Sequence, residues 1–114
     1  MFENWKELLG TLRQSSNKLG NTNPKVLEAY RGLNAALGTN GALDAKTREL
    51  IALAVAVTTR CDGCISSHAA AAVKAGATEA EVSDALGTAI ALNAGAAYVY
   101  SLHAMEAFQQ NASA

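Results

Sequence analysis

The stretch ELIALAVAVTTRCDGCISSH, residues 49–68, predicts two helices joined at a pair of cysteines. Its apolar part, Leu50–Val57, has no polar face, which is typical of a central and buried helix. Asp44 is a suitable N-cap for that helix. The next helix is expected to begin near Cys61 and to end before Gly76, because glycine is the usual residue just past a helix C-terminus.

Further helices are expected on both sides of this stretch. Residues 2–18 place apolar side chains on one stripe, and Pro24 starts a second helix behind the N-cap Asn23. Thr78 and Glu81 form a capping box for a fifth helix. Asparagine and glycine at residues 93–95 predict a break, followed by a sixth helix that ends near residue 109.

The composition agrees with a helical domain. Half of the 114 residues are apolar and the net charge is −1. Since no hairpin signal or alternating strand pattern is present, we expect one all-α domain of about six helices over residues 1–114. The weak charge gives no reason to expect binding to nucleic acid or to an anionic membrane. No apolar run follows the charged start, so no signal peptide is predicted and the cytoplasm is the expected compartment.

Two apolar segments predict contacts beyond the monomer. No charged residue lies between Asp84 and Glu106, a span long enough to cross a bilayer, but the expected break favours two buried helices over a membrane span. The segments Leu50–Val57 and Ala85–Ala97 offer more apolar surface than a six-helix monomer covers easily. We therefore expect an obligate homo-oligomer.

Two cysteines and a histidine share one face of the helix that begins near Cys61. Cys61, Cys64 and His68 stand at positions i, i+3 and i+7, which a helical period brings to one stripe. The reactive form of cysteine is the thiolate, which the positive end of a helix dipole favours. An imidazole one turn away can accept a proton, and a CxxC pair can close a disulfide. The pattern predicts reversible dithiol–disulfide chemistry.

Glu49 is the fourth candidate. If the two helices pack antiparallel, Glu49 lies near the last turns of the second helix, closer to His68 than to Cys61. A carboxylate in that position could orient the imidazole and raise its basicity. Spacing alone also allows a solvated carboxylate or an ion pair with Lys46.

These residues carry a family resemblance. The spacing E-x11-C-x2-C-x3-H resembles the alkylhydroperoxidase D-like branch of the carboxymuconolactone decarboxylase family, over about residues 40–100. The run AAAAVKAGATEAEV, residues 69–82, is also typical of that family. In its best-known members a further histidine stands between the two cysteines, where this chain has Asp62 and Gly63.

The resemblance implies an all-helical subunit that assembles into a homotrimer or homohexamer. It implies a peroxidase or disulfide reductase with a peroxide or disulfide substrate and no bound cofactor or metal. Its electrons would come from a dihydrolipoyl group or a similar dithiol, with a lipoyl protein or a peroxiredoxin as partner. By this analogy Cys64 attacks the peroxide, Cys61 resolves it as a disulfide, and Glu49 and His68 relay protons. The helix terminus instead favours Cys61 as the more acidic thiol.

Three other functions stay open on the sequence alone. The first is decarboxylation of a muconolactone-type acid, which does not need the CxxC pair. The second is a zinc site from Cys61, Cys64 and His68, completed by Glu49 or His103. The third is a non-enzymatic oligomer whose cysteines sense redox state. A thioredoxin fold is excluded, because the strands it requires are not predicted.

Overall fold

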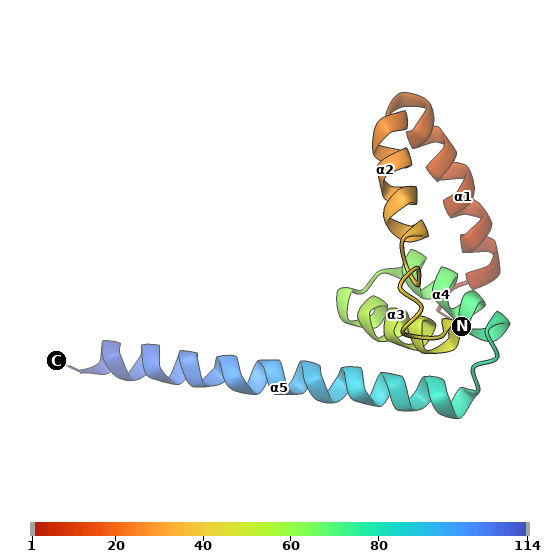
Figure 1. The fold of residues 1–114 in the computed structure, drawn as a ribbon. Helices are drawn as coiled ribbons and strands as arrows, with labels where there is room; N and C mark the ends of the chain where they lie inside the picture. Colours follow the sequence, from red (N-terminus) through yellow and green to blue (C-terminus); the bar gives the residue numbers. More distant parts are fainter. Residues whose placement is uncertain (1, 114) are drawn as a thin grey trace.

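The computed structural model describes residues 2–113, in which all regular secondary structure is helical. The helices are α1 (Trp5–Thr22), α2 (Pro24–Ala35), α3 (Ala45–Thr59), α4 (Asp62–Lys74) and α5 (Glu79–Ala112). The expected all-α class is confirmed. In Figure 1, α1 and α2 form a hairpin that rises from the α3–α4 pair, and α5 runs beneath α3 and extends far past it.

Local side-chain signals set most of the helix boundaries. Asp44 Oδ1 accepts a hydrogen bond from the backbone N–H of Thr47 at 2.8 Å and caps α3. Arg60 has a φ of 54°, in the left-handed region, so it ends α3 and turns the chain at once into α4. The capping box of Thr78 and Glu81 is present at the start of α5. Together, the Asp44 cap, the left-handed residue Arg60 and the capping box explain where α3 begins and ends and where α5 begins.

The predicted break near residues 93–95 is wrong, because α5 is one continuous helix of 34 residues. The Asn93 amide donates to the Ala89 carbonyl at 2.7 Å and to the Thr58 hydroxyl of α3 at 3.0 Å. The amide thus bonds to its own helix and to α3, without interrupting the backbone ladder. Gly95 inside a helix costs only about 1 kcal/mol relative to alanine, too little to break it.

The interior of the folded chain is small. Its buried side chains are Leu53, Ala56, Ala72 and Ala89, together with Ser66. The Ser66 hydroxyl donates to the Trp5 carbonyl at 2.6 Å, which ties the start of α1 to α4. Helix α3 is central, as expected, but it is not buried all round: Ile51 and Val55 are about half exposed because only α4 and α5 cover α3.

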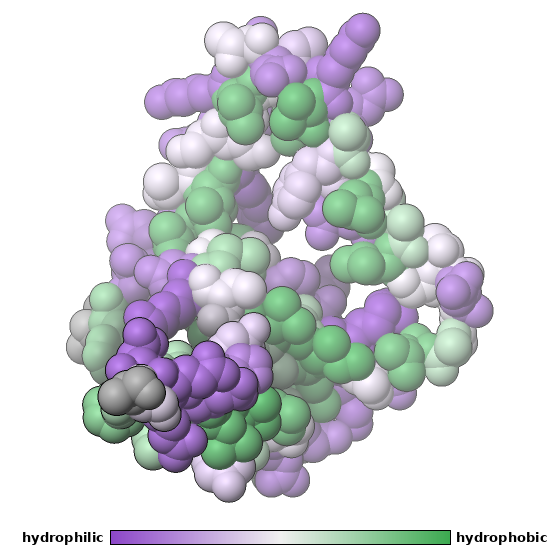
Figure 2. All heavy atoms as spheres, turned by 90° about the vertical axis from the view of Figure 1, so that its left-hand side faces the viewer, coloured by the Kyte–Doolittle hydropathy of each residue, from purple (hydrophilic) through white to green (hydrophobic). Residues whose placement is uncertain are grey.

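Helix α5 is the one helix within residues 2–113 that is long and apolar enough to cross a membrane. A single such helix is weak evidence for a membrane span, because core helices of soluble proteins meet the same criteria. Few of its side chains are buried against the rest of the chain. Figure 2, which views the molecule from the side toward which α5 extends, shows apolar side chains in green gathered over its lower part.

Candidate active site

The two cysteines stand at the start of α4. Cys61 is the N-cap residue, and its Sγ accepts a hydrogen bond from the backbone N–H of Cys64 at 3.2 Å. The first helical turn brings the two Cα atoms to 5.2 Å, and the sulfurs are joined in a disulfide. Both residues are partly exposed. The CxxC pair therefore lies where solvent and a small reactant can reach it, at the positive end of a helix.

His68 and Glu49 are in direct contact. The ring nitrogen Nδ1 of His68 lies 2.6 Å from Oε2 of Glu49, and both side chains are only about a quarter exposed. This confirms the expected juxtaposition across the α3–α4 pair. An ionised carboxylate can only accept hydrogen bonds, so Nδ1 carries the hydrogen and Nε2 is the nitrogen available to a reactant.

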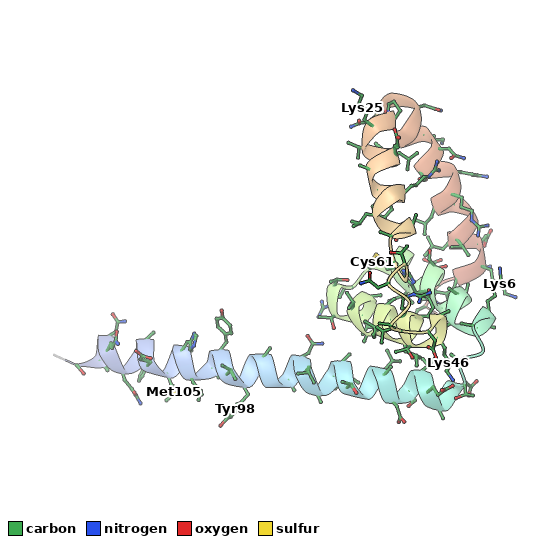
Figure 3. All side chains as sticks on the ribbon, viewed as in Figure 1. Lys6, Lys25, Lys46, Cys61, Tyr98 and Met105 are labelled. Atoms are coloured by element: carbon green, nitrogen blue, oxygen red, sulfur yellow. A yellow bond between two sulfur atoms is a disulfide. The ribbon has the colours of Figure 1, made fainter. Side chains whose placement is uncertain are left out.

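One cavity contains both sulfurs and the imidazole. It measures about 930 Å³ and lies between the α1–α2 hairpin and the outer face of α4. Cys61, Cys64 and His68 line it, whereas Glu49 holds the imidazole from behind and is not part of the lining. Figure 3 shows Cys61 at the base of the hairpin. The i, i+3, i+7 stripe thus becomes one wall of a cavity.

Sequence reasoning missed the opposite wall of that cavity. Helix α1 contributes Leu9, Leu12 and Arg13, and α2 contributes Tyr30 and Arg31. The apolar stripe of α1 and the helical spacing of α2 were visible in the sequence. The sequence did not show that both faces turn toward the cysteines, because this depends on how the hairpin packs on α4.

Gly63, between the cysteines, has a packing role. A Cβ built there would lie 3.1 Å from Cδ1 of Leu12, closer than ordinary van der Waals contact. The absence of a side chain allows α1 to approach the first turn of α4. No described contact of this site replaces the histidine that stands between the two cysteines in the best-known members of the family it resembles.

The zinc hypothesis gains no support from the described residues. Within residues 2–113, no group of three or more His, Cys, Asp and Glu side chains is placed to hold a metal ion, and both sulfurs are taken up by the disulfide. His103 lies on the exposed outer part of α5, where its ring packs against Tyr100 with centroids 4.7 Å apart.

Lys46 pairs with Glu81 and not with Glu49. The Lys46 Nζ lies 2.8 Å from Oε2 of Glu81, joining the first turns of α3 and α5. The hydrogen bond from Lys46 is the main cause that lowers the pKa of Glu81, and the same bond raises the pKa of Lys46. Glu49 is therefore left to His68, and the alternative ion pair considered for it is wrong.

The chain resembles proteins of several bacteria. It is 64% identical over 108 residues to an uncharacterized protein of Haemophilus influenzae, covering 95% of this chain and 96% of that one. It is 35% identical over 98 residues to the uncharacterized protein 4 in the cox locus of Paracoccus denitrificans, covering 83% and 88%. The sequence relatives thus span nearly the whole domain.

A solved structure and a family match point to the same protein family. A carboxymuconolactone decarboxylase family protein from Legionella pneumophila, crystallised in its apo form, superposes with a TM-score of 0.73 at 34% identity, covering 93% of this chain and 95% of that one. A protein of Methanobacterium thermoautotrophicum gives 0.65 at 34% identity, covering 70% and 90%. Residues 24–107 match the carboxymuconolactone decarboxylase family. The chain therefore belongs to the carboxymuconolactone decarboxylase family.

Proposed function

We propose that this protein is a thiol-dependent antioxidant oxidoreductase, a peroxidase or disulfide reductase of the alkylhydroperoxidase D type. One observation carries the proposal: the Cys61–Cys64 disulfide and the ring of His68 line a single cavity, and Glu49 holds that ring by a hydrogen bond of 2.6 Å. A nucleophile, a base and a group that orients the base are the three parts of an activated thiol site. A reducing cytoplasm would regenerate such a dithiol.

The first step is attack on a peroxide. The Cys64 thiolate forms a bond to one oxygen of the hydroperoxide, the O–O bond breaks, and the alkoxide takes a proton to leave as an alcohol. His68 is the proton carrier, because it stands one helical turn from Cys64 and lines the same cavity. Glu49 keeps the hydrogen on Nδ1, so that proton exchange occurs through Nε2.

The second step closes the disulfide. The Cys61 thiolate attacks the sulfenic sulfur of Cys64, the S–O bond breaks, and the oxygen leaves as water after taking a proton. The position of Cys61 suits this role, because the N–H of Cys64 and the helix terminus both favour a negative charge on its sulfur. We propose this order of attack on the family analogy, and the cysteine-to-serine variants described below test it against the reverse order, in which Cys61 attacks the peroxide.

A dithiol completes the cycle. One thiolate of the donor, a dihydrolipoyl group or a similar dithiol, attacks the disulfide to form a mixed disulfide, and its second thiol releases the reduced protein as the donor becomes oxidised. A lipoyl protein or a peroxiredoxin is the proposed partner in the cell. A disulfide substrate would be reduced by the Cys61–Cys64 dithiol, which would itself be oxidised to the disulfide.

Stopped-flow mixing of the reduced protein with a panel of peroxides tests the proposal. Mass spectrometry is expected to find the loss of two hydrogens, reversed by dihydrolipoamide. Cys61→Ser should stop at a sulfenic acid on Cys64 that dimedone traps, and Cys64→Ser should lose rapid peroxide consumption. Free thiols that persist with every peroxide, at rates no faster than a small free thiol, would contradict the proposed activity.

A further inference from the structure

The cavity next to the cysteines carries positive charge on three helices. Arg13 of α1, Arg31 of α2 and Lys74 at the end of α4 all line it, together with the amides of Asn17 and Asn34. No aspartate or glutamate belongs to its lining. This is unusual for a chain with nine basic and ten acidic residues.

The three cations also make no ion pairs among the described residues. The ion pairs within residues 2–113 are Lys46 with Glu81 and His68 with Glu49. Two carboxylates beside the cavity stand outside its lining: Glu28 lines a smaller neighbouring hollow that shares Arg31, and Glu49 lies behind the imidazole. Asp62, in the first turn of α4, is exposed and is not part of the lining.

The three cations line the same cavity as the two cysteines. Leu12, the residue before Arg13, lies against Gly63 between the two cysteines, so the part of α1 that carries Arg13 passes the first turn of α4. Lys74 stands ten residues beyond Cys64 on α4, which is about 15 Å along a helix. The lining also includes apolar side chains such as Leu9 and Ala71. A cavity lined in this way suits an organic molecule that brings a reactive group to the cysteines and carries a negative charge.

We infer that the reactant which meets the cysteines carries an anionic group, a carboxylate on an organic hydroperoxide or on a dithiol, and that Arg13, Arg31 and Lys74 recognise it. The inference rests on the proposed function and specifies its substrate class. Arginine pairs with carboxylates through two parallel hydrogen bonds, which orients the molecule as well as attracting it.

A pair of alkylating reagents of similar size, one anionic and one neutral, tests the inference without peroxide or donor. Iodoacetate is an anion and iodoacetamide is neutral, and each transfers its carbon to a thiolate with loss of iodide. Because the cations alter the acidity of the thiols equally for both reagents, the ratio of the two rates isolates the attraction of the anion. The ratio is measured on the reduced protein at 0.1 M ionic strength and normalised to a small free thiol.

The wild type is expected to favour iodoacetate in this normalised ratio. The triple variant Arg13→Gln, Arg31→Gln, Lys74→Gln should lower the ratio by about threefold or more, because it removes the positive charge that attracts the anion, an attraction that salt screens over a Debye length of about 10 Å at 0.1 M. Raising the ionic strength to 1 M, where that length falls to about 3 Å, should lower the wild-type ratio in the same way. The conservative Arg31→Lys variant should retain the ratio, since the charge is kept.

Lys25→Gln is the matched control. Lys25 is an exposed cation at the far end of the same hairpin, away from Cys61 in Figure 3, and it does not line the cavity. Its removal should leave the ratio unchanged. A ratio in the triple variant equal to that of the wild type, or an equal fall in Lys25→Gln, would overturn the inference.

A second measurement identifies the anionic reactant. Peroxide consumption is compared for a fatty-acid hydroperoxide and its methyl ester, and reduction of the disulfide is compared for dihydrolipoate and dihydrolipoamide. A charge preference that the triple variant removes, in either comparison, supports the inference and names the reactant. Neutral and anionic partners that react equally well in both comparisons overturn it, while leaving the proposed peroxidase activity intact.

Discussion

The α3–α4 pair and the outer half of α5 are both rich in small apolar residues, yet they differ in how they are covered. The pair is held by Ser66 against Trp5 and by Glu49 against His68. Beyond Asn93, every described residue of α5 is exposed, and α3 is the one helix that contacts α5. The α3–α4 pair is therefore an organised site within one chain, whereas the outer half of α5 is a surface that no other described part of the chain covers.

The chain on its own exposes far more surface than a compact protein of its mass. The chain exposes 8873 Å², whereas a compact monomer of 11.8 kDa would expose about 5,900 Å². The radius of gyration is 19.0 Å, against about 13 Å for a compact domain of this length. An isolated helix gains most of its stability from packing. We propose that copies of this chain cover the outer half of α5 in a homotrimer or homohexamer.

The largest expected effect concerns this assembly. Light scattering without detergent should give three or six times 11.8 kDa. Tyr98 and Leu102 lie one turn apart on α5, and each is more than half exposed. The double variant Tyr98→Glu, Leu102→Glu should dissociate the assembly, because the charges could not be buried in an interface. Figure 3 shows Tyr98 and Met105 projecting from α5 away from the rest of the chain.

Gln14→Glu, an exposed charge change on α1, serves as the control for this experiment and should keep the wild-type mass. A wild-type protein that scatters as a clean monomer would refute the assembly. A protein that is soluble only with detergent would refute it as well and would point to a membrane role for α5.

The next largest effect concerns the well-packed region. His68→Ala should slow oxidation of the cysteines by about 10²–10⁴-fold, the usual contribution of a positioned proton carrier. His68 is partly exposed and its removal opens no large apolar cavity, so the melting temperature should change far less than the rate. The measurement is the pH–rate profile of peroxide oxidation and of thiol alkylation between pH 5 and 9. Identical profiles for variant and wild type would show that the helix terminus alone activates the thiols.

Removal of the carboxylate behind the ring should have a smaller effect. Glu49→Gln keeps the size of the side chain and one acceptor oxygen at the 2.6 Å contact but removes the charge. Because Glu49 acts only through the imidazole, we expect a loss of about tenfold in the oxidation rate and a pH profile displaced from that of the wild type. A loss as great as that of His68→Ala would mean that Glu49 contacts the reactant itself.

The smallest effect is expected at the ion pair between α3 and α5. Glu81→Gln retains an acceptor for the Thr78 cap but loses the attraction to Lys46. Since the folded protein lowers the pKa of Glu81 below its ordinary value of 4.5, the charge stabilises the fold above that pH and ceases to do so as the pH falls through the lowered value. The variant should melt a few degrees lower than the wild type near pH 7, with no difference under strongly acidic conditions. A difference that persists in acid would assign the effect to the cap.

The sequence by itself determined the helical class, the caps at Asp44 and Thr78, and the shared face of Cys61, Cys64 and His68. These features are local: each depends on residues within about two turns of one helix, and helical periodicity relates them directly. The place of Glu49 was also within reach, because an antiparallel pair with a short connection constrains which ends meet.

The tertiary structure alone decided three things. Asn93 looked like a break in the sequence, but its bond to Thr58 on α3 secures it within a continuous helix. The basic wall of the cavity comes from α1 and α2, whose approach to α4 depends on Gly63 and Ser66 at the contact. Exposure of the outer half of α5 follows from the length of α3, which at 15 residues spans less than half of a 34-residue neighbour. Each depends on contacts between residues distant in the chain, which local propensity does not encode.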